Sequence, residues 1–255
     1  MKLLIIGRTA SGKDVLREAL EHEGLSFARS YTDRPRREGE GDTHHFVSAS
    51  EMDRLMPDLV LTTAVGEYRY GIRRADFDIE DGFVVDPGAV DEVAELAPDD
   101  IIVLAYMSPV DGAGQRVAAL TRDGDEAALK ARLEAEDERF AAFERRLDGK
   151  SVPGATIRIV NDYEPATVEG AVQEVLANRR MLGRLARVVE TLRDSGVFVS
   201  SPDGFHISVA MRSGETCDMS PETLALSLLG DLKGEGSQVL AELVLDYLKL
   251  DTPDM

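Results

Sequence analysis

The sequence predicts an α/β fold built on a central parallel sheet. Short apolar stretches alternate along the chain with stretches whose apolar residues recur at helical spacing. Residues 101–106, IIVLAY, are wholly apolar, which is typical of a parallel strand buried on both faces. A glycine-rich segment, residues 7–14, directly follows the first apolar stretch and precedes the first helical one. Strands that alternate with helices favour a parallel sheet covered by helices.

The first strand and the first helix flank the most informative motif. Residues 2–6 form the predicted strand, and residues 14–22 carry apolar side chains at helical spacing. Between them, GRTASGKD matches the phosphate-loop pattern Gly-x4-Gly-Lys. The N–H groups of such a loop bind a polyphosphate, together with the helix dipole and the lysine, here Lys13. The pattern normally ends in Ser or Thr, whose hydroxyl ligates Mg²⁺, whereas this chain has Asp14.

The remaining elements follow in order up to residue 180. The predicted strands are residues 25–27, 58–65, 67–72, 82–86, 101–106 and 155–159. Gly66 joins two of these strands tightly. Ser48 and Glu51 match a capping box, which opens a short helix ending at residue 55. The other predicted helices are residues 110–120, 126–146 and 166–178.

The pattern changes after residue 180, so we expect residues 181–255 to form a small α+β extension. Residues 182–193 predict an amphipathic helix. Pro202-Asp203-Gly204 predicts a hairpin turn between short strands. The other predicted elements are strands at 197–199 and 206–210 and helices at 221–232 and 237–248. The extension has no chemical motif, and its role stays open between packing and formation of a homo-oligomer.

Composition narrows the classes of function. The chain has 255 residues, and 29 basic against 48 acidic residues give a net charge of −19, which opposes nucleic-acid binding. No stretch approaches the roughly 20 apolar residues needed to span a bilayer, and we expect no signal peptide and no membrane association. The single cysteine, Cys217, fits a reducing cytoplasm. Small anionic molecules are the expected partners.

The cations of this acidic chain gather at one place. Arg34, Arg36 and Arg37 surround Pro35, with the hydroxyl of Ser30 upstream. Guanidinium groups bind phosphate bidentately, and proline stiffens the turn that presents them. This cluster therefore predicts a site for a phosphate monoester, separate from the phosphate loop.

The residues from Ser30 to Ser48 resemble the acceptor-binding segment of the guanylate kinase family, S-x-T-T-R-x-P-R-x-G-E-x-x-G-x-x-Y-x-F-V-S. The order of later motifs is also similar: YRYGI at 68–72, the strand ending in Asp86, and VND at 160–162. The resemblance covers residues 1–180. It implies a P-loop kinase fold with a small mixed β/loop monophosphate-binding subdomain at about residues 30–80 and a helical lid at about 120–147.

The resemblance also implies roles for individual residues. The residues implied to bind ATP are Gly7, Thr9, Ala10, Ser11, Gly12, Lys13, Asp14, Arg116 and Asn161. Those implied to bind the acceptor monophosphate are Ser30, Arg34, Arg36, His44, Tyr70 and Asp86, of which the last would contact the guanine. The residues implied to be catalytic are Lys13, Arg122 and Arg132.

Considered without the resemblance, several of these residues have ordinary structural explanations. Arg122 and Arg132 lie in a densely charged helical region, where i,i+4 surface pairs are usual. Tyr70 is also explained as a strand aromatic. Asp86 is explained as a cap and Asn161 as a turn residue.

The chain departs from the family pattern at four places. His44 stands for a tyrosine, Asp33 stands for a threonine, and one residue is missing between Arg34 and Pro35. The family's guanine-reading glutamate falls at Leu61 or Thr62. Loss of that acceptor would weaken discrimination between bases.

The predicted activity is transfer of the ATP γ-phosphoryl group to a nucleoside monophosphate, GMP or dGMP, with Mg²⁺. Asp14 either holds that Mg²⁺ directly or through water, or marks a failing site; retention of Lys13 favours the first. Two alternatives stay open. One is a kinase for another phosphorylated acceptor, such as another nucleotide or ribose bisphosphate. The other is a non-catalytic binding module.

Overall fold

The computed structural model describes residues 1–37, 40–98, 100–123, 126–194, 199–200, 207–210 and 216–219. The chain forms two compact units, which are described separately: residues 1–152 with 156–174, and residues 153–155 with 175–255. Within the described ranges, every helix is too short or too polar to cross a membrane.

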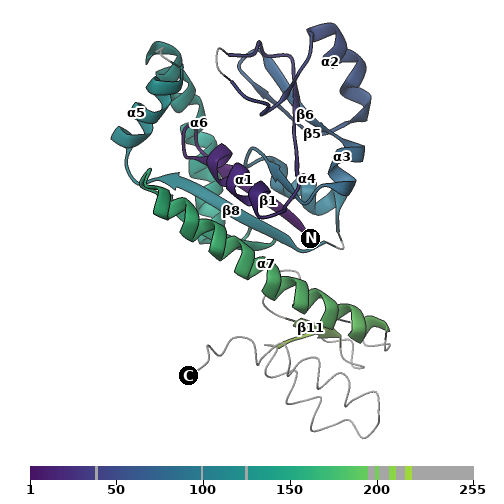
Figure 1. Ribbon diagram of the computed structural model, residues 1–255. Helices are drawn as coiled ribbons and strands as arrows, with labels where there is room; N and C mark the ends of the chain where they lie inside the picture. Colours follow the sequence, from purple (N-terminus) through teal and green to yellow (C-terminus); the bar gives the residue numbers. More distant parts are fainter. Residues whose placement is uncertain are drawn as a thin grey trace, which may run out of the picture. The chain divides into compact units, whose positions relative to one another are not determined.

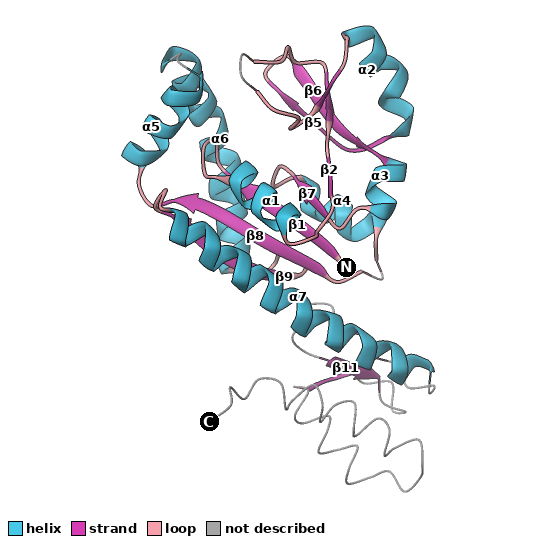
Figure 2. Cartoon of the chain, viewed as in Figure 1, coloured by secondary structure: helices cyan, strands magenta, loops and turns pink. Residues whose placement is uncertain are grey.

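A five-stranded sheet forms the centre of the first unit (Figure 2). Its strands are β1 (Lys2–Gly7), β2 (Phe27–Ala28), β7 (Gly82–Val84), β8 (Ile102–Pro109) and β9 (Ala155–Asn161). Their order is β2-β7-β1-β8-β9, and β1 pairs in parallel with both β7 and β8. The predicted α/β fold with a central parallel sheet is confirmed. The strand that precedes the phosphate loop lies in the middle.

Helices cover both faces of this sheet (Figure 1). α1 (Lys13–His22) packs on β1. On the other face, Leu4 and Ile6 of β1 share a buried cluster with residues of α4 (Ala89–Leu96) and α6 (Glu126–Asp148). Because side chains alternate along a strand, the apolar residues 3–6 of β1 can serve both faces. This packing fixes the end of β1, where the loop begins.

A second, mixed sheet follows in the same unit. Its strands are β3 (Tyr31–Thr32), β4 (His45–Phe46), β5 (Leu59–Val65) and β6 (Tyr68–Arg73), in the order β4-β3-β6-β5. β3 pairs in parallel with β4 but antiparallel with β6. The predicted turn at Gly66 is present, with a φ of 63° that suits glycine. The small mixed sheet agrees with the predicted fold class.

The first unit also contains the helices α2, α3 and α5 and one 3₁₀ turn. The predicted capping box of α2 (Ala49–Leu55) is present: the Ser48 hydroxyl accepts from Glu51 N–H, and the Glu51 side chain accepts from Ser48 N–H. A 3₁₀ turn (Met56–Asp58) follows, and α3 (Arg74–Ile79) comes after β6. α5 (Gly112–Asp123) links β8 to α6.

One prediction of helix boundaries is wrong. The sequence pattern separates residues 166–178 from residues 182–193, but α7 is a single helix, Pro165–Asp194. The residues between are Arg179, Arg180 and Met181, all good helix formers without a proline or a left-handed cap. A change in composition there does not end the helix.

In the second unit, β10 (Val199–Ser200), β11 (Ile207–Ala210) and β12 (Thr216–Met219) form an antiparallel sheet. Pairing of β10 with β11 agrees with the predicted hairpin, while β12 was not predicted. The predicted turn at 202–204 and the predicted helices 221–232 and 237–248 lie outside the described residues.

Candidate active site

The predicted phosphate loop lies between β1 and α1, at the carboxyl edge of the parallel sheet where α/β proteins bind ligands. Ala10 has a φ of 57° and Gly12 a φ of 92°, so two loop residues are left-handed. A side chain at Gly12 would meet the amide of Asn161, with its Cβ 2.5 Å from Nδ2. The loop therefore needs both a glycine there and support from its neighbours.

That support reaches five consecutive carbonyl oxygens of the loop. Each accepts a hydrogen bond from a side chain, and the donors come from α1, from α5, and from the end of β9 with the segment that follows it. The bonds are Lys13 Nζ to Gly7 O (2.6 Å) and to Arg8 O (2.8 Å), Gln115 Nε2 to Thr9 O (2.8 Å), Tyr163 OH to Ala10 O (3.1 Å) and Asn161 Nδ2 to Ser11 O (3.0 Å). In a trans peptide the N–H points opposite to the carbonyl. The carbonyls held by these side chains constrain the peptide planes of the loop, although the N–H of Thr9 donates to Glu136 and the N–H of Ser11 donates to Arg8 O.

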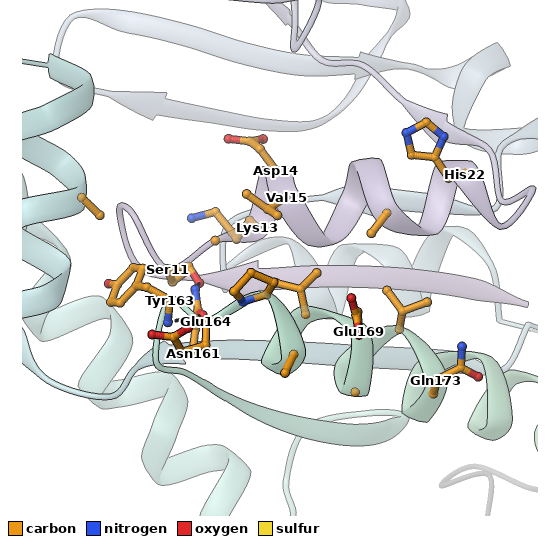
Figure 3. A pocket seen from close by; sticks show the side chains of 18 of the residues that line it. Ser11, Lys13, Asp14, Val15, His22, Asn161, Tyr163, Glu164, Glu169 and Gln173 are labelled. Atoms are coloured by element: carbon orange, nitrogen blue, oxygen red, sulfur yellow. Dashed lines mark hydrogen bonds between the residues drawn. The ribbon is translucent and has the colours of Figure 1, made fainter.

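A cavity of about 1110 Å³ opens beside the loop, between α1 and the start of α7 (Figure 3). Lys13 and Asp14 line it on one side, and Asn161 and Tyr163 line it on the other. Pockets of this size hold small organic ligands. Within the described residues, the hydroxyl of Ser11 is buried and has no hydrogen-bond partner. A buried hydroxyl without a partner is costly, so a ligand that contacts it would gain.

Asp14 is the residue predicted to hold a metal beside the loop. It lies in the first turn of α1 and lines the cavity. Among the described residues, no group of three or more His, Cys, Asp or Glu could hold a metal by itself. Mg²⁺ usually needs only one or two carboxylates when it also binds substrate phosphates. Asp14 fits that mode of binding.

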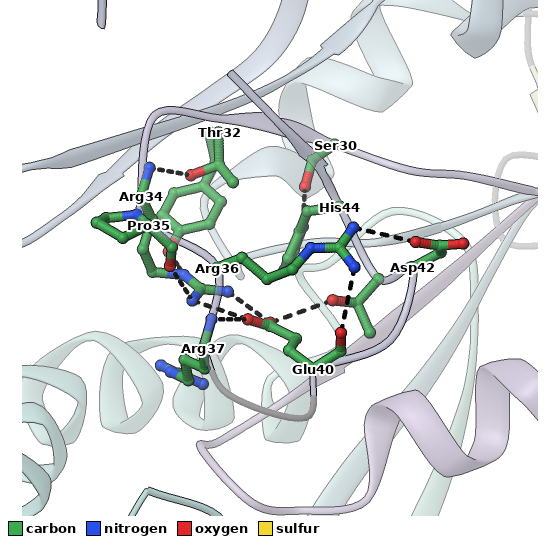
Figure 4. A network of polar contacts seen from close by, with 11 residues as sticks. Ser30, Thr32, Arg34, Pro35, Arg36, Arg37, Glu40, Asp42 and His44 are labelled. Atoms are coloured by element: carbon green, nitrogen blue, oxygen red, sulfur yellow. Dashed lines mark hydrogen bonds and ion pairs between the residues drawn. The ribbon is translucent and has the colours of Figure 1, made fainter. Parts of the chain in front are cut away.

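The predicted acceptor residues centre on Arg34, which is only 8% exposed (Figure 4). Its guanidinium forms a bidentate ion pair with Glu40, at 3.0 Å from Nη1 and 2.6 Å from Nη2. Nε donates to the hydroxyl of Tyr70 at 3.1 Å, and Nη1 also donates to Pro35 O at 2.9 Å. Four of its five N–H groups are thereby engaged, so this arginine is held in one orientation.

Glu40 is the carboxylate that fixes this part of the site, and it was not among the predicted site residues. Besides Arg34, it accepts from the N–H of Arg37 at 3.0 Å and from the hydroxyl of Thr43 at 3.2 Å. Burial alone would raise the pKa of Glu40, but the hydrogen bonds from Arg34 and Arg37 outweigh burial and lower it to about 2. Glu40 is therefore ionised at neutral pH.

The other acceptor residues lie in the same network. The Ser30 hydroxyl is 2.7 Å from Nδ1 of His44, whose ring also contacts the ring of Tyr70. Burial and then the charge of Arg34 lower the pKa of His44, so the imidazole is neutral at pH 7. Arg36 pairs with Asp42 at 3.0 Å on the exposed side. Thus Ser30, Arg34, Arg36, His44 and Tyr70 come together as predicted.

Asp86 lies in a different setting. It follows β7 at the same edge of the sheet as the phosphate loop. One oxygen of its carboxylate is 2.9 Å from Nη1 of Arg139 on α6, and the other accepts from Gly88 N–H at 3.2 Å. These contacts fit the capping explanation together with an ion pair. Sequence reasoning did not select Arg139, because it is one of many charges on a long helix.

The three other predicted arginines lie on α5 and α6. Arg116 lines a second cavity of about 490 Å³ with Arg8 and Gln115, not the cavity beside the loop. Arg122 belongs to α5 and Arg132 to α6. Their side chains lie outside what the structure describes, so their predicted catalytic role stays a prediction.

At the position of the missing glutamate, Leu61 is buried, with 5% exposure. It lies where the pairing of β5 with β6 shifts, and its φ of 52° is unusual for a leucine. Its N–H donates to the carboxylate of Glu92 on α4 at 2.9 Å. A carboxylate is therefore present nearby, but it binds the backbone of Leu61.

Among solved structures, the chain is similar to the guanylate kinase from Anaplasma phagocytophilum. The two sequences are 20% identical, the TM-score is 0.46, and the match covers 69% of this chain and 85% of that chain. No protein-family model and no curated protein matches the sequence. The family, the substrate and the activity are therefore proposals. The α/β fold is established by the strand order of the central sheet.

Proposed function

We propose that the chain is an ATP-dependent nucleoside monophosphate kinase that converts GMP or dGMP and ATP to GDP or dGDP and ADP. The observation that supports the proposal is the loop between β1 and α1, in which side chains hold five consecutive carbonyls and the left-handed Gly12 precedes Lys13. The arginine cluster around Arg34 lies in the same compact unit, and we propose that it binds the phosphate of the acceptor, which must displace Glu40 from this guanidinium.

The proposed reaction needs positioning and charge rather than a protein nucleophile. An oxygen of the acceptor phosphate attacks the γ-phosphorus in line, a new P–O bond forms, and the bond to ADP breaks. Lys13 would leave the two loop carbonyls that it now contacts and bind the polyphosphate. Arg122 and Arg132 would stabilise the transferring group. Mg²⁺ supplies further charge neutralisation when it arrives with ATP, and Asp14 is the side chain proposed to hold it.

A second candidate, a kinase of another phosphorylated acceptor, is favoured by one observation. The side chain of Leu61 is apolar and buried, and the nearby carboxylate of Glu92 is engaged by the backbone. A site without a buried acceptor discriminates weakly between bases. Ribose bisphosphate or a wider set of nucleotides would then be accepted.

A coupled assay of ADP release decides between the candidates. It measures kcat/KM with GMP, dGMP, AMP, UMP and ribose 1,5-bisphosphate, all with Mg·ATP. The proposal predicts the highest values for GMP and dGMP, and loss of turnover in Lys13→Ala but not in the control Lys150→Ala. Turnover of ribose 1,5-bisphosphate without turnover of GMP would replace the first candidate with the second. No turnover with any acceptor would favour a non-catalytic binding module.

Three further expectations remain proposals of the same kind. The cytoplasm is the proposed compartment, and small nucleotides rather than nucleic acids or membranes are the proposed partners. Formation of a homo-oligomer through residues 181–255 is also proposed, without an assigned surface.

A further inference from the structure

One residue of the phosphate loop, Thr9, is held at three atoms by helices α5 and α6. Its N–H donates to Oε2 of Glu136 at 2.9 Å, and its hydroxyl donates to Oε1 of the same carboxylate at 2.6 Å. Its carbonyl accepts from Gln115 at 2.8 Å. The side chains that donate to the loop carbonyls are neutral or, in Lys13, positively charged. Among these supports of the loop, Glu136 is the one that carries a carboxylate.

Glu136 is itself firmly placed. It is 9% exposed, and Phe140 and Phe143 on the same helix belong to the buried cluster under the central sheet. The neighbouring Asp137 accepts from Arg8 at 2.6 Å, and the Arg8 guanidinium lies 5.2 Å from the centre of the Phe140 ring. The first half of the loop is therefore attached to a helix that is anchored in the core.

A buried carboxylate beside an anion-binding loop has an electrostatic disadvantage, because it repels the polyphosphate. Its compensating effect is geometric. The next residue, Ala10, is left-handed, which costs free energy and persists only where the surroundings fix it. Two hydrogen bonds to one side chain fix the Thr9 peptide immediately before that residue.

We infer that Glu136 is a positioning residue of the donor site: by holding Thr9, it keeps the loop in the shape that binds the nucleotide phosphates. This inference rests on the proposed binding of ATP at the loop. Glutamine at the same position keeps both hydrogen bonds, since its oxygen can accept from the N–H and its amide can donate to the hydroxyl. Alanine keeps neither.

The test is calorimetric titration of Mg·ATP into the full chain with wild type, Glu136→Ala, Glu136→Gln and the control Glu138→Ala. Glu138 is exposed on the same helix, and its replacement by alanine removes the same charge. We expect Glu136→Ala to raise the Kd for ATP about tenfold, which corresponds to about 1.4 kcal/mol, and Glu136→Gln to stay within about threefold of wild type. KM for ATP should rise more than kcat falls, and Glu138→Ala should match wild type.

Two outcomes would overturn the inference. Equal ATP affinity in wild type and Glu136→Ala would leave the carboxylate without a role in the loop, and tighter binding in both Glu136 variants would make it an inhibitory charge. Should Glu136→Ala not fold, Thr9→Val against Thr9→Ser tests the same hydroxyl contact, and only Thr9→Val should weaken ATP binding.

A second measurement separates this inference from the proposed function. If wild type does not bind ATP, the proposed function fails, yet hydrogen exchange of the loop amides in the nucleotide-free protein still tests the role of Glu136. We expect faster exchange at residues 9–12 in Glu136→Ala but not in Glu136→Gln. Unchanged exchange in both variants would refute the positioning role.

Discussion

Replacement of Glu40 by glutamine should destabilise the folded protein, because Glu40 is the common acceptor of the Arg34 cluster. Its side chain is 13% exposed and accepts from Arg34, from the N–H of Arg37 and from the hydroxyl of Thr43. Glutamine has the same shape, but its amide would direct hydrogens at the guanidinium of Arg34. The buried cation would then lose its counter-charge, which is the costly way to break such a pair.

The size of the effect follows from proton linkage. The pKa of Glu40 falls from 4.5 to about 2 on folding, and 1.36 kcal/mol per pKa unit gives about 3 kcal/mol of stability at neutral pH. Since the folded pKa is the lower one, this contribution is fully present above pH 4.5 and is lost as the pH falls through about 2.

The assay is urea unfolding of wild type, Glu40→Gln and the control Glu23→Gln, whose side chain is exposed. At pH 7 we expect Glu40→Gln to lower the free energy of unfolding by about 3 kcal/mol and Glu23→Gln to leave it within about 0.5 kcal/mol. Between pH 4.5 and the acid limit of folding, the gap between wild type and Glu40→Gln should narrow. A gap that is absent at pH 7, or that does not narrow on acidification, would refute the reasoning.

Four further variants test other parts of the site. Asp14→Ser should lower Mg²⁺-dependent turnover in the coupled assay, and a rise would mean that the native carboxylate impairs the metal site. Since the pKa of His44 is lowered in the fold, the wild type should lose stability as the pH falls through about 6.5. Urea unfolding at pH 7.5 and 5.5 should find a smaller loss in His44→Gln than in the wild type, and equal losses would contradict this. Tyr163→Phe removes one support of the loop and should raise the Kd for ATP roughly fivefold by calorimetry. An unchanged Kd in this variant would show that the hydroxyl does not support the loop. Gly12→Ala places a Cβ 2.5 Å from a neighbouring amide at a left-handed position, so it should abolish ATP binding in the same titration, and retained binding would show that the loop can relax.

Local patterns were sufficient to predict much of the fold. Strands β1 and β8 were predicted because a strand buried on both faces forms a nearly continuous apolar stretch, here residues 3–6 and 101–106. The phosphate loop and the capping box of α2 depend on residues close together in the sequence, so their geometry is local. The grouping of Ser30, Arg34, His44 and Tyr70 followed from the order of motifs.

The contacts that hold the loop could not be predicted in the same way. Glu136 and Arg139 lie on the densely charged α6, where a buried carboxylate and an exposed one look alike in the sequence. Their partners, Thr9 and Asp86, are distant along the chain. Only the packing of α6 against the sheet selects which of its charges face inward.

The central claim is that the loop after β1 is a working nucleotide site. Calorimetric titration of Mg·ATP into wild type and Lys13→Ala tests it most directly. The structure predicts one ATP bound per chain, with at least about tenfold weaker binding after removal of the Lys13 ammonium group. Absence of ATP binding by wild type, or equal affinity of the two proteins, would contradict the account.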